Sequence, residues 1–285
     1  RDPGTSLERR RVVQREKPHG YIFEVPASAD GLVEPVPLTA MGRFEHEAAA
    51  HDPATGIIYL TEDRHQSLFY RFIPEVPGKL REGGRLQALA VAGQPRFDAR
   101  NWNGRALNVG DSVETTWVDL PEPDVAVNDL RLRGYERGAA LFARGEGLCH
   151  ADGSFAFTAT IGGPARLGQV FVYEPGAGEN SAGEATTPGR LTLVAESGQE
   201  SLLKNGDNLT LSPWGDLIIC EDTSEQCGIV GLRPDGTMYP IAYNAYTRAE
   251  LAGVCFSPDG STMFVNLQQN GMTLAITGSW RALRG

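Results

Sequence analysis

One repeated pattern constrains the fold of this chain more than any other feature of its sequence. Each repeat consists of a polar residue, a short apolar strand, a turn that contains glycine, and a second apolar strand. The four copies are EAAAHDPATGIIYLTED (47–63), EGLCHADGSFAFTAT (146–160), NLTLSPWGDLIICED (208–222) and VCFSPDGSTMFVNL (254–267). A self-similar pattern of this length indicates one structural unit used several times, and it decides the fold before any local motif does.

Each copy is followed by further apolar runs of strand length. A third run follows every copy, at 68–74, 169–175, 228–234 and 272–278, and a fourth follows two of them, at 191–197 and 238–244. Three or four antiparallel strands joined by glycine turns are typical of a β-propeller blade. A β-sandwich has similar hairpins, but the shared register of the polar residues favours the propeller. We therefore predict an all-β propeller with four visible blades.

Two segments do not follow the repeat. Residues 20–26 (GYIFEVP) resemble the closing strands of an earlier blade, and residues 75–143 form a long Gly/Pro-rich insertion. Within 127–147 the apolar spacing predicts a short helix. We expect a single domain over 1–285, with the 75–143 segment as a loop and short helix that cover one mouth of the channel. We also expect this domain to be N-terminally incomplete and part of a larger, roughly six-bladed propeller.

The charge balance narrows the possible ligands. The chain has 36 acidic and 26 basic residues and a net charge of −10. This sign of charge repels phosphate backbones, so we expect no nucleic acid partner. It suits hard cations such as calcium, which bind carboxylate and carbonyl oxygens. No apolar run approaches the ~18 residues of a membrane span.

The four cysteines lack zinc-type spacing. A disulfide between Cys220 and Cys227 across a short loop is conceivable, but the sequence favours buried free thiols.

Two polar positions recur in register with the turn glycines Gly56, Gly153, Gly215 and Gly260. The first position is held by Glu146 and Asn208, seven residues before the glycine, and by Glu47, nine before it in a turn two residues longer. The second position, six residues after the glycine, is held by Glu62, Glu221 and Asn266, with Ala159 in the second repeat. In a propeller the innermost strands line the channel, so equivalent positions of different blades converge on its axis. Two rings of oxygen ligands would form a hard-metal site. The alternative is that these residues are solvated at strand ends, and a shared register argues against it.

Three further acidic residues adjoin these positions. Asp63 and Asp222 directly follow Glu62 and Glu221, and Asp207 precedes Asn208. Strand alternation turns such neighbours to the opposite face, unless the strand ends there and both carboxylates are available.

Arg144 lies two residues before Glu146, so in an extended segment both side chains point the same way. A guanidinium beside metal-bound carboxylates would clamp two oxygens of a phosphate. A structural Arg–Glu ion pair explains the spacing equally well. The sequence has no G-x-S-x-G elbow, P-loop or GxGxxG motif, so serine-nucleophile hydrolysis and nucleotide-fold chemistry lack support.

Six motifs together resemble the PhoX-type alkaline phosphatases, a bacterial propeller family. They are GRFEHE (42–47), the DPATG to YLTED run (52–63), FYRFIP (69–74), FARGEG (142–147), the DNL to CED run (207–222) and the FSPDG to FVNLQ run (256–268). The resemblance covers about Gly20 to Trp280. It implies a secreted or periplasmic phosphatase that hydrolyses small phosphorylated substrates and requires calcium and iron. We further expect a monomer.

The resemblance also implies roles for particular residues. In the family, the glutamates of the H-E and R-x-E-G motifs bind metal and the arginine binds the substrate phosphate, which correspond to Glu47, Glu146 and Arg144. The remaining metal ligands fall on Glu62, Asp63, Asp207, Asn208, Glu221 and Asp222.

One departure concerns the iron site. The family carries an upstream blade with an N-C-A-G-G motif, whose cysteine ligates iron, and nothing before Gly20 matches it. Either the sequence is part of a longer protein or this member has lost that site, and Cys220, one residue before Glu221, is a poor substitute.

Two alternative functions stay open at this point. One is a calcium-dependent lactonase, which would not need Arg144 because a lactone is neutral. The other is a non-catalytic propeller that binds a partner at one mouth and has lost the iron site.

Overall fold

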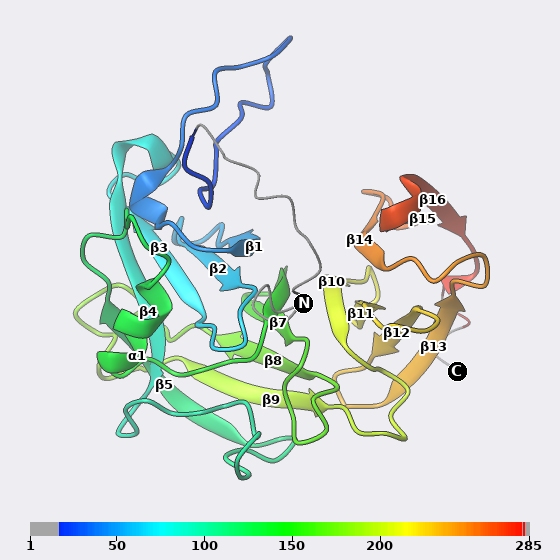
Figure 1. The fold of residues 1–285 in the computed structure, drawn as a ribbon. Helices are drawn as coiled ribbons and strands as arrows, with labels where there is room; N and C mark the ends of the chain where they lie inside the picture. The colour runs from blue at the N-terminus through cyan, green and yellow to red at the C-terminus, as the bar shows by residue number, and fades with distance from the viewer. Residues whose placement is uncertain (1–16, 281, 283–285) are drawn as a thin grey trace.

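The structure, a computed structural model, describes residues 17–280 and 282, and they form a mainly β protein (Figure 1). Four antiparallel blades follow one another along the chain. The first blade contains β1 (His46–His51), β2 (Ile58–Glu62), β3 (Tyr70–Pro74) and β4 (Gly84–Val91), and the second β6 (Gly145–Ala151), β7 (Ser154–Ala159), β8 (Gln169–Glu174) and β9 (Arg190–Glu196). The third contains β10 (Gly206–Leu211), β11 (Leu217–Glu221), β12 (Gly228–Leu232) and β13 (Met238–Tyr243), and the fourth β14 (Leu251–Phe256), β15 (Thr262–Leu267) and β16 (Met272–Thr277).

The blades are arranged as a propeller, which confirms the fold predicted from the repeats. Strand β6 packs against β1 and β10, and β10 packs against β14, so the first strand of each blade is the innermost one (Figure 1). The four turn glycines all have positive φ, between 71° and 90°. Only glycine adopts this conformation without strain, which explains why it recurs in each inner hairpin.

Every inner hairpin contains a β-bulge at the same place. The register shifts lie between His46 and Ala49 in β1, between Gly145 and Leu148 in β6, between Gly206 and Leu209 in β10, and between Ala252 and Cys255 in β14. At a bulge two residues of one strand face a single residue of its partner, and the backbone turns locally. The recurrent bulges therefore redirect the side chains at the polar position of each repeat.

Threonines opposite the bulges join neighbouring blades. The Thr61 hydroxyl in β2 donates a hydrogen bond to the carbonyl oxygen of Glu146 at 2.5 Å. The Thr158 hydroxyl in β7 makes the same bond to the carbonyl oxygen of Asp207 at 2.6 Å. These bonds fix the bulged backbone of one blade to the blade before it, so the residues at the bulges hold a defined relative position.

Two sequence predictions about the irregular segments are corrected. The 75–143 segment contains β4 and β5 (Ser112–Asp119) besides the short helix α1 (Leu130–Glu136), and β5 pairs with both β4 and β9. It therefore merges the first two blades into one nine-stranded sheet. Residues 20–26 form no strand; Phe23 makes a single bridge to Pro37. Prolines at 26, 35 and 37 withhold the amide donors that a strand pair needs.

Short 3-10 helices complete the secondary structure: η1 (Thr39–Met41), η2 (Leu80–Glu82) and η3 (Gln268–Asn270). No helix in the described part of the chain is long and apolar enough to cross a membrane. All four cysteines are free, and Cys220 and Cys227 are buried in the apolar core between the third and fourth blades. This confirms the prediction of buried free thiols.

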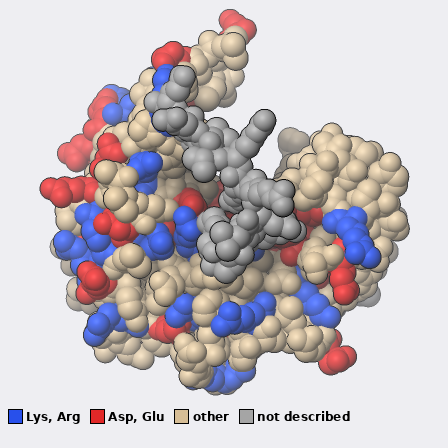
Figure 2. Space-filling model, viewed as in Figure 1, with Lys and Arg blue, Asp and Glu red and all other residues tan. Residues whose placement is uncertain are grey.

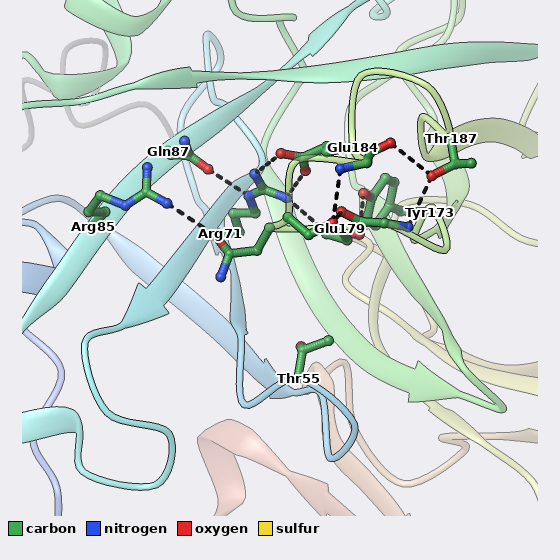
Figure 3. Close-up of polar contacts among 12 residues, drawn as sticks. Thr55, Arg71, Arg85, Gln87, Tyr173, Glu179, Glu184 and Thr187 are labelled. Carbon is green, nitrogen blue, oxygen red and sulfur yellow. Dashed lines mark hydrogen bonds and ion pairs between the residues drawn. The ribbon is translucent and has the colours of Figure 1, made fainter.

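A buried polar cluster stabilises the outer part of the first two blades (Figure 3). The Arg71 guanidinium in β3 donates to Gln87 at 2.7 Å, to Glu179 at 2.7 Å and to Glu184 at 2.5 Å. It also lies 4.3 Å from the ring centroid of Trp117. Both glutamates belong to the loop between β8 and β9, so this cluster, which we call the Arg71 cluster, ties that loop of the second blade to the first.

Candidate functional site

The inner bulges bring acidic side chains together at one end of the channel. Glu47, Glu146 and Asp207 each occupy a bulge, in β1, β6 and β10. Asp63 and Asp222 follow the last residues of β2 and β11. Asp222 and Asp207 interact electrostatically, and Asp63 interacts with both Glu47 and Glu146. These five side chains, together with Glu250 and Arg144, form what we call the axial cluster.

Arg144 is held by two members of the cluster. Its Nε and Nη2 atoms donate to the two carboxylate oxygens of Asp63 at 2.6 and 3.1 Å, and Nη2 also donates to Glu146 at 2.5 Å. The backbone of Arg144 has φ = 55°, a left-handed conformation that is rare for residues other than glycine. Such a conformation at a polar site is more typical of functional than of structural positions. Arg144 and Glu146 are in contact, as their spacing led us to expect, but they meet through this left-handed residue and a bulge and not through an extended segment.

The carboxylates in the cluster outnumber the positive charge that balances them. Burial is the main cause of a raised pKa at Glu47, Glu146, Asp207 and Glu250, and neighbouring carboxylates raise the pKa further. The pKa of Asp207 rises to about 8 and that of Glu250 to about 7. For all four groups the opposing positive charge is that of Arg144. The folded chain therefore concentrates more negative charge here than its own residues neutralise.

Asn208 connects this cluster to the fourth blade. Its side-chain nitrogen donates to Asp207 Oδ1 at 2.7 Å, and its side-chain oxygen accepts the backbone N–H of Gly253 in β14. The strand register also corrects the sequence alignment, because Asp207, not Asn208, is the structural equivalent of Glu146. The turn between Leu211 and Leu217 is longer than that between Ala151 and Ser154, which shifts the equivalent position.

Glu62 and Glu221, which the sequence placed in a second ring, lie apart from the axial cluster. Glu62 is fully buried, accepts a hydrogen bond from the Tyr70 hydroxyl at 2.7 Å and lies 3.9 Å from Arg131 of α1. Burial raises the pKa of Glu62 to about 7. The carboxylate of Glu221 accepts the backbone N–H groups of Lys204 at 2.7 Å and Gly228 at 2.8 Å. Strands β2 and β11 end at these residues, and the aspartates that follow them reach the axis instead.

Asn266, the third residue of that position, accepts a hydrogen bond from the Thr273 hydroxyl within the fourth blade at 2.6 Å.

One member of the axial cluster was missed by the sequence reading. Glu250 precedes β14, and its carboxylate interacts with Asp207, Asp222 and Glu47. It lies outside the four aligned segments, so the repeat gave no signal for it. A search for acidic residues just before each inner strand could have found it.

The donor chemistry of the axial cluster fits a hard cation. Its ligands are carboxylate oxygens, and its excess charge would be neutralised by calcium rather than by protons. Among residues 17–280, no three His, Cys, Asp or Glu side chains are already arranged closely enough to enclose a metal ion. Cys220 does not fit as an iron ligand, because its thiol is fully buried among apolar side chains and burial raises its pKa. The axial cluster therefore fits a hard cation by its negative charge and by its oxygen ligands, and not by a preformed coordination geometry.

The face of the molecule seen in Figure 1 is shown as a space-filling view in Figure 2. On its left and lower parts, over the first two blades, Lys and Arg side chains are interspersed with Asp and Glu side chains. Acidic atoms are visible deeper, between these blades and the third and fourth.

Comparisons with known proteins bear on the family and the fold of the chain. The sequence model of the family described as "Alkaline phosphatase PhoX" matches residues 3–271. The structure of Pseudomonas fluorescens PhoX, solved in complex with vanadate, a transition state analogue, is similar with a TM-score of 0.64 and 19% identity. The match covers 89% of this chain and 54% of that one, so the chain spans about half the length of the solved protein. This level of identity shows a shared fold.

Other solved propellers are less similar. A streptogramin B lyase matches with a TM-score of 0.38 and 12% identity, over 82% of this chain and 65% of the lyase. The periplasmic gluconolactonase of Pseudomonas aeruginosa matches with a TM-score of 0.36 and 13% identity, over 90% of this chain and 71% of that one. No curated protein sequence matches significantly.

Proposed function

Because this chain belongs to the PhoX alkaline phosphatase family, we propose that its axial cluster serves the hydrolysis of phosphate monoesters. The observation that carries the proposal is the surplus of carboxylates around Arg144, since several cations and one guanidinium suit a phosphate dianion better than a neutral substrate. In this proposal Arg144 and the carboxylates of the axial cluster bind and position the phosphate.

Arg144 is the residue that would bind the phosphate. Its Nε and Nη2 atoms are fixed by Asp63 and Glu146, and Nη1 makes no hydrogen bond to any residue in the described part of the chain. A guanidinium oriented in this way is pre-organised, so little conformational entropy is lost when phosphate oxygens bind. The charge that develops on the phosphoryl group would be stabilised by the N–H groups of Nη1.

Glu47, Asp63, Glu146, Asp207, Asp222 and Glu250 would hold cations. Asn208 would position Asp207, because its side-chain nitrogen donates to that carboxylate and its oxygen accepts the N–H of Gly253. Calcium suits these oxygen ligands, and when bound it supplies positive charge that neutralises the phosphoryl oxygens. The family resemblance implies iron as well. Cys220 does not fit as its ligand, because it is buried in the apolar core between the third and fourth blades.

The cellular location and the oligomeric state are proposals that rest on the family and on the composition of the chain. We propose that the protein works in the periplasm or outside the cell as a monomer, on small phosphorylated substrates. Its net charge of −10 disfavours nucleic acid as a partner.

The test is hydrolysis of p-nitrophenyl phosphate by the complete protein supplied with calcium and iron, with EDTA treatment and a neutral lactone as comparisons. We expect phosphatase activity that EDTA abolishes and no lactone hydrolysis. Lactone hydrolysis without phosphatase activity would favour the lactonase alternative. Absence of both activities, with metal bound, would favour a non-catalytic binding protein.

A further inference from the structure

A polar pocket of about 610 Å³ lies next to the axial cluster. Its walls come from the loop before β10 and from the loop between β11 and β12, and Tyr243 at the end of β13 lines it as well. A volume of this size is in the range of small-molecule binding sites.

The pocket and the axial cluster share a wall. Asn205, which lines the pocket, donates from its side chain to the carbonyl oxygen of Thr160 at 2.9 Å. The backbone N–H of Thr160 in turn donates to the carbonyl oxygen of Arg144 at 2.9 Å, and the N–H of Asp222 donates to that of Asn205 at 3.0 Å. The loop before β10 leads into the bulge at Asp207, and the loop after β11 starts with Asp222, so the pocket lies at the same mouth of the channel as the axial cluster. A substrate whose phosphate binds Arg144 would extend its remaining part toward the pocket.

The lining favours a molecule with several hydroxyl groups. It contains hydroxyl and amide side chains that both donate and accept hydrogen bonds, among them Gln199, Ser201, Thr223 and Gln226. Tyr243, 52% exposed, adds an aromatic surface on which C–H groups can pack. Polar side chains beside an aromatic ring suit a sugar or another polyol, because its hydroxyl groups can bond to the polar side chains while its C–H groups pack on the ring.

The charges in the pocket disfavour a second anionic group. Lys204 lines the pocket, and its positive charge interacts with Glu221. Glu200 and Glu225 add two further carboxylates to the lining. The balance is negative, so a neutral polyol is accepted where a second phosphate would be repelled.

The pocket is also held in shape. The Glu221 carboxylate accepts hydrogen bonds from the backbone N–H groups of Lys204 and Gly228, and Gly228 pairs with Tyr243 across β12 and β13. Glu221 thus joins two walls of the pocket. Glu221, although it lies apart from the axial cluster, would therefore serve substrate binding by holding the pocket in shape.

From these contacts we infer that the pocket binds the alcohol part of the phosphate monoester and selects substrates whose alcohol is a neutral polyol, such as a sugar phosphate. The inference rests on the proposed phosphatase function, which it deepens by naming the substrate class.

The kinetic test compares glucose 6-phosphate, fructose 1,6-bisphosphate and p-nitrophenyl phosphate as substrates of the complete protein. We expect glucose 6-phosphate to have the highest kcat/KM. In Tyr243→Ala and in Ser224→Trp, which fills the pocket from an exposed position, the kcat/KM ratio of glucose 6-phosphate to p-nitrophenyl phosphate should fall about tenfold, mainly through KM. Tyr246→Ala is the matched control, since Tyr246 is 75% exposed and lines a different pocket, and its ratio should stay at the wild-type value.

A binding test separates this inference from the proposed function. Saturation-transfer NMR with free glucose should show binding to the wild type and loss of binding in Ser224→Trp. A protein that hydrolyses no p-nitrophenyl phosphate contradicts the phosphatase proposal, and glucose binding then still tests the pocket. Absence of glucose binding, equal binding by wild type and Ser224→Trp, or an unchanged kinetic ratio in both pocket variants would overturn the inference.

Discussion

Two polar clusters, one at the channel axis and one on the outer strands of the first two blades, are built around an arginine and carboxylates but differ in their charge balance. In the Arg71 cluster, Glu179 receives hydrogen bonds from Arg71 and from the hydroxyls of Tyr59 and Tyr173. Arg71 also pairs with Glu184, so each carboxylate has a partner. In the axial cluster, Arg144 faces Asp63 and Glu146 directly, and four more carboxylates surround them.

The difference separates a structural from a functional arrangement. Buried charges that satisfy one another define how two parts of a fold pack, and breaking the pair is costly. Buried carboxylates with too little positive charge beside them raise each other's pKa and destabilise the folded chain until a ligand neutralises them. We therefore expect substitutions in the Arg71 cluster to affect stability, and those in the axial cluster to affect catalysis and cation binding.

The largest expected effect is on stability, in Arg71→Met. Arg71 and Glu179 are both almost fully buried, with side chains 1% and 3% exposed. Removal of the guanidinium leaves Glu179 without its cation and should lower the free energy of unfolding by about 3–5 kcal/mol. Chemical denaturation measures this loss. Arg85→Met is the matched control, because Arg85 is 59% exposed and pairs with Asp119 at 3.6 Å, and little change is expected there. An equal loss in both variants would contradict the structural role.

The next effect is on catalysis, in Arg144→Ala. Loss of the guanidinium removes charge-assisted hydrogen bonds to the phosphate, so kcat/KM for p-nitrophenyl phosphate should fall roughly 10²- to 10³-fold, or about 3–4 kcal/mol. Arg144→Lys should recover only part, because an ammonium lacks the planar fork. Calcium content should change little in either variant. Full activity of Arg144→Ala would refute the role of this residue.

A smaller effect concerns pH. In calcium-free protein the pKa values of Asp207 and Glu250 are raised to about 8 and about 7, against about 4 in an unfolded chain. Between these values the folded state binds more protons than the unfolded state, so stability is greatest at low pH and falls as pH rises. We expect the melting temperature in EDTA to decrease from pH 5 to pH 8. The decrease should be weaker in Asp207→Asn, and an increase with pH would contradict the charge surplus.

The smallest effect is expected in Glu62→Gln. Glu62 is bonded to Tyr70 and lies apart from the axial cluster, so kcat/KM should stay within roughly threefold of wild type. Asp63→Asn, one residue further, should lower activity because Asp63 holds Arg144, and should lower calcium affinity because Asp63 is one of the carboxylates proposed to hold cations. If Glu62→Gln were the more damaging substitution, the placement of the two side chains relative to the axis would be wrong.

The sequence was sufficient for the features that the repeat carries. The turn glycines and the strand periods predicted four blades, and the aligned repeats predicted equivalent positions for Glu47 and Glu146, which both lie in bulges. The spacing of two residues placed Arg144 beside Glu146. These predictions succeeded because each depends on local backbone geometry that recurs along the chain.

The remainder depends on contacts between distant segments. Whether Glu62 or Asp63 faces the axis is decided by where β2 ends relative to the bulge in β1. Strand β5 pairs with β9, which lies far along the sequence. It lies outside the four repeats, so the repeat pattern could not predict it. Arg71 and Glu179 likewise come from different blades, so their pairing had no local signal.

The central claim is that the axial cluster is a cation site, and the most direct measurement is thermal unfolding with and without calcium at pH 8. A ligand that binds only the folded state adds RT ln(1 + [L]/Kd), or about 2.7 kcal/mol at 100 times Kd. We predict a melting temperature roughly 5–10 °C higher in calcium than in EDTA, with most of this gain lost in Asp207→Asn and retained in Arg71→Met. A melting temperature that calcium and EDTA leave unchanged would contradict the claim.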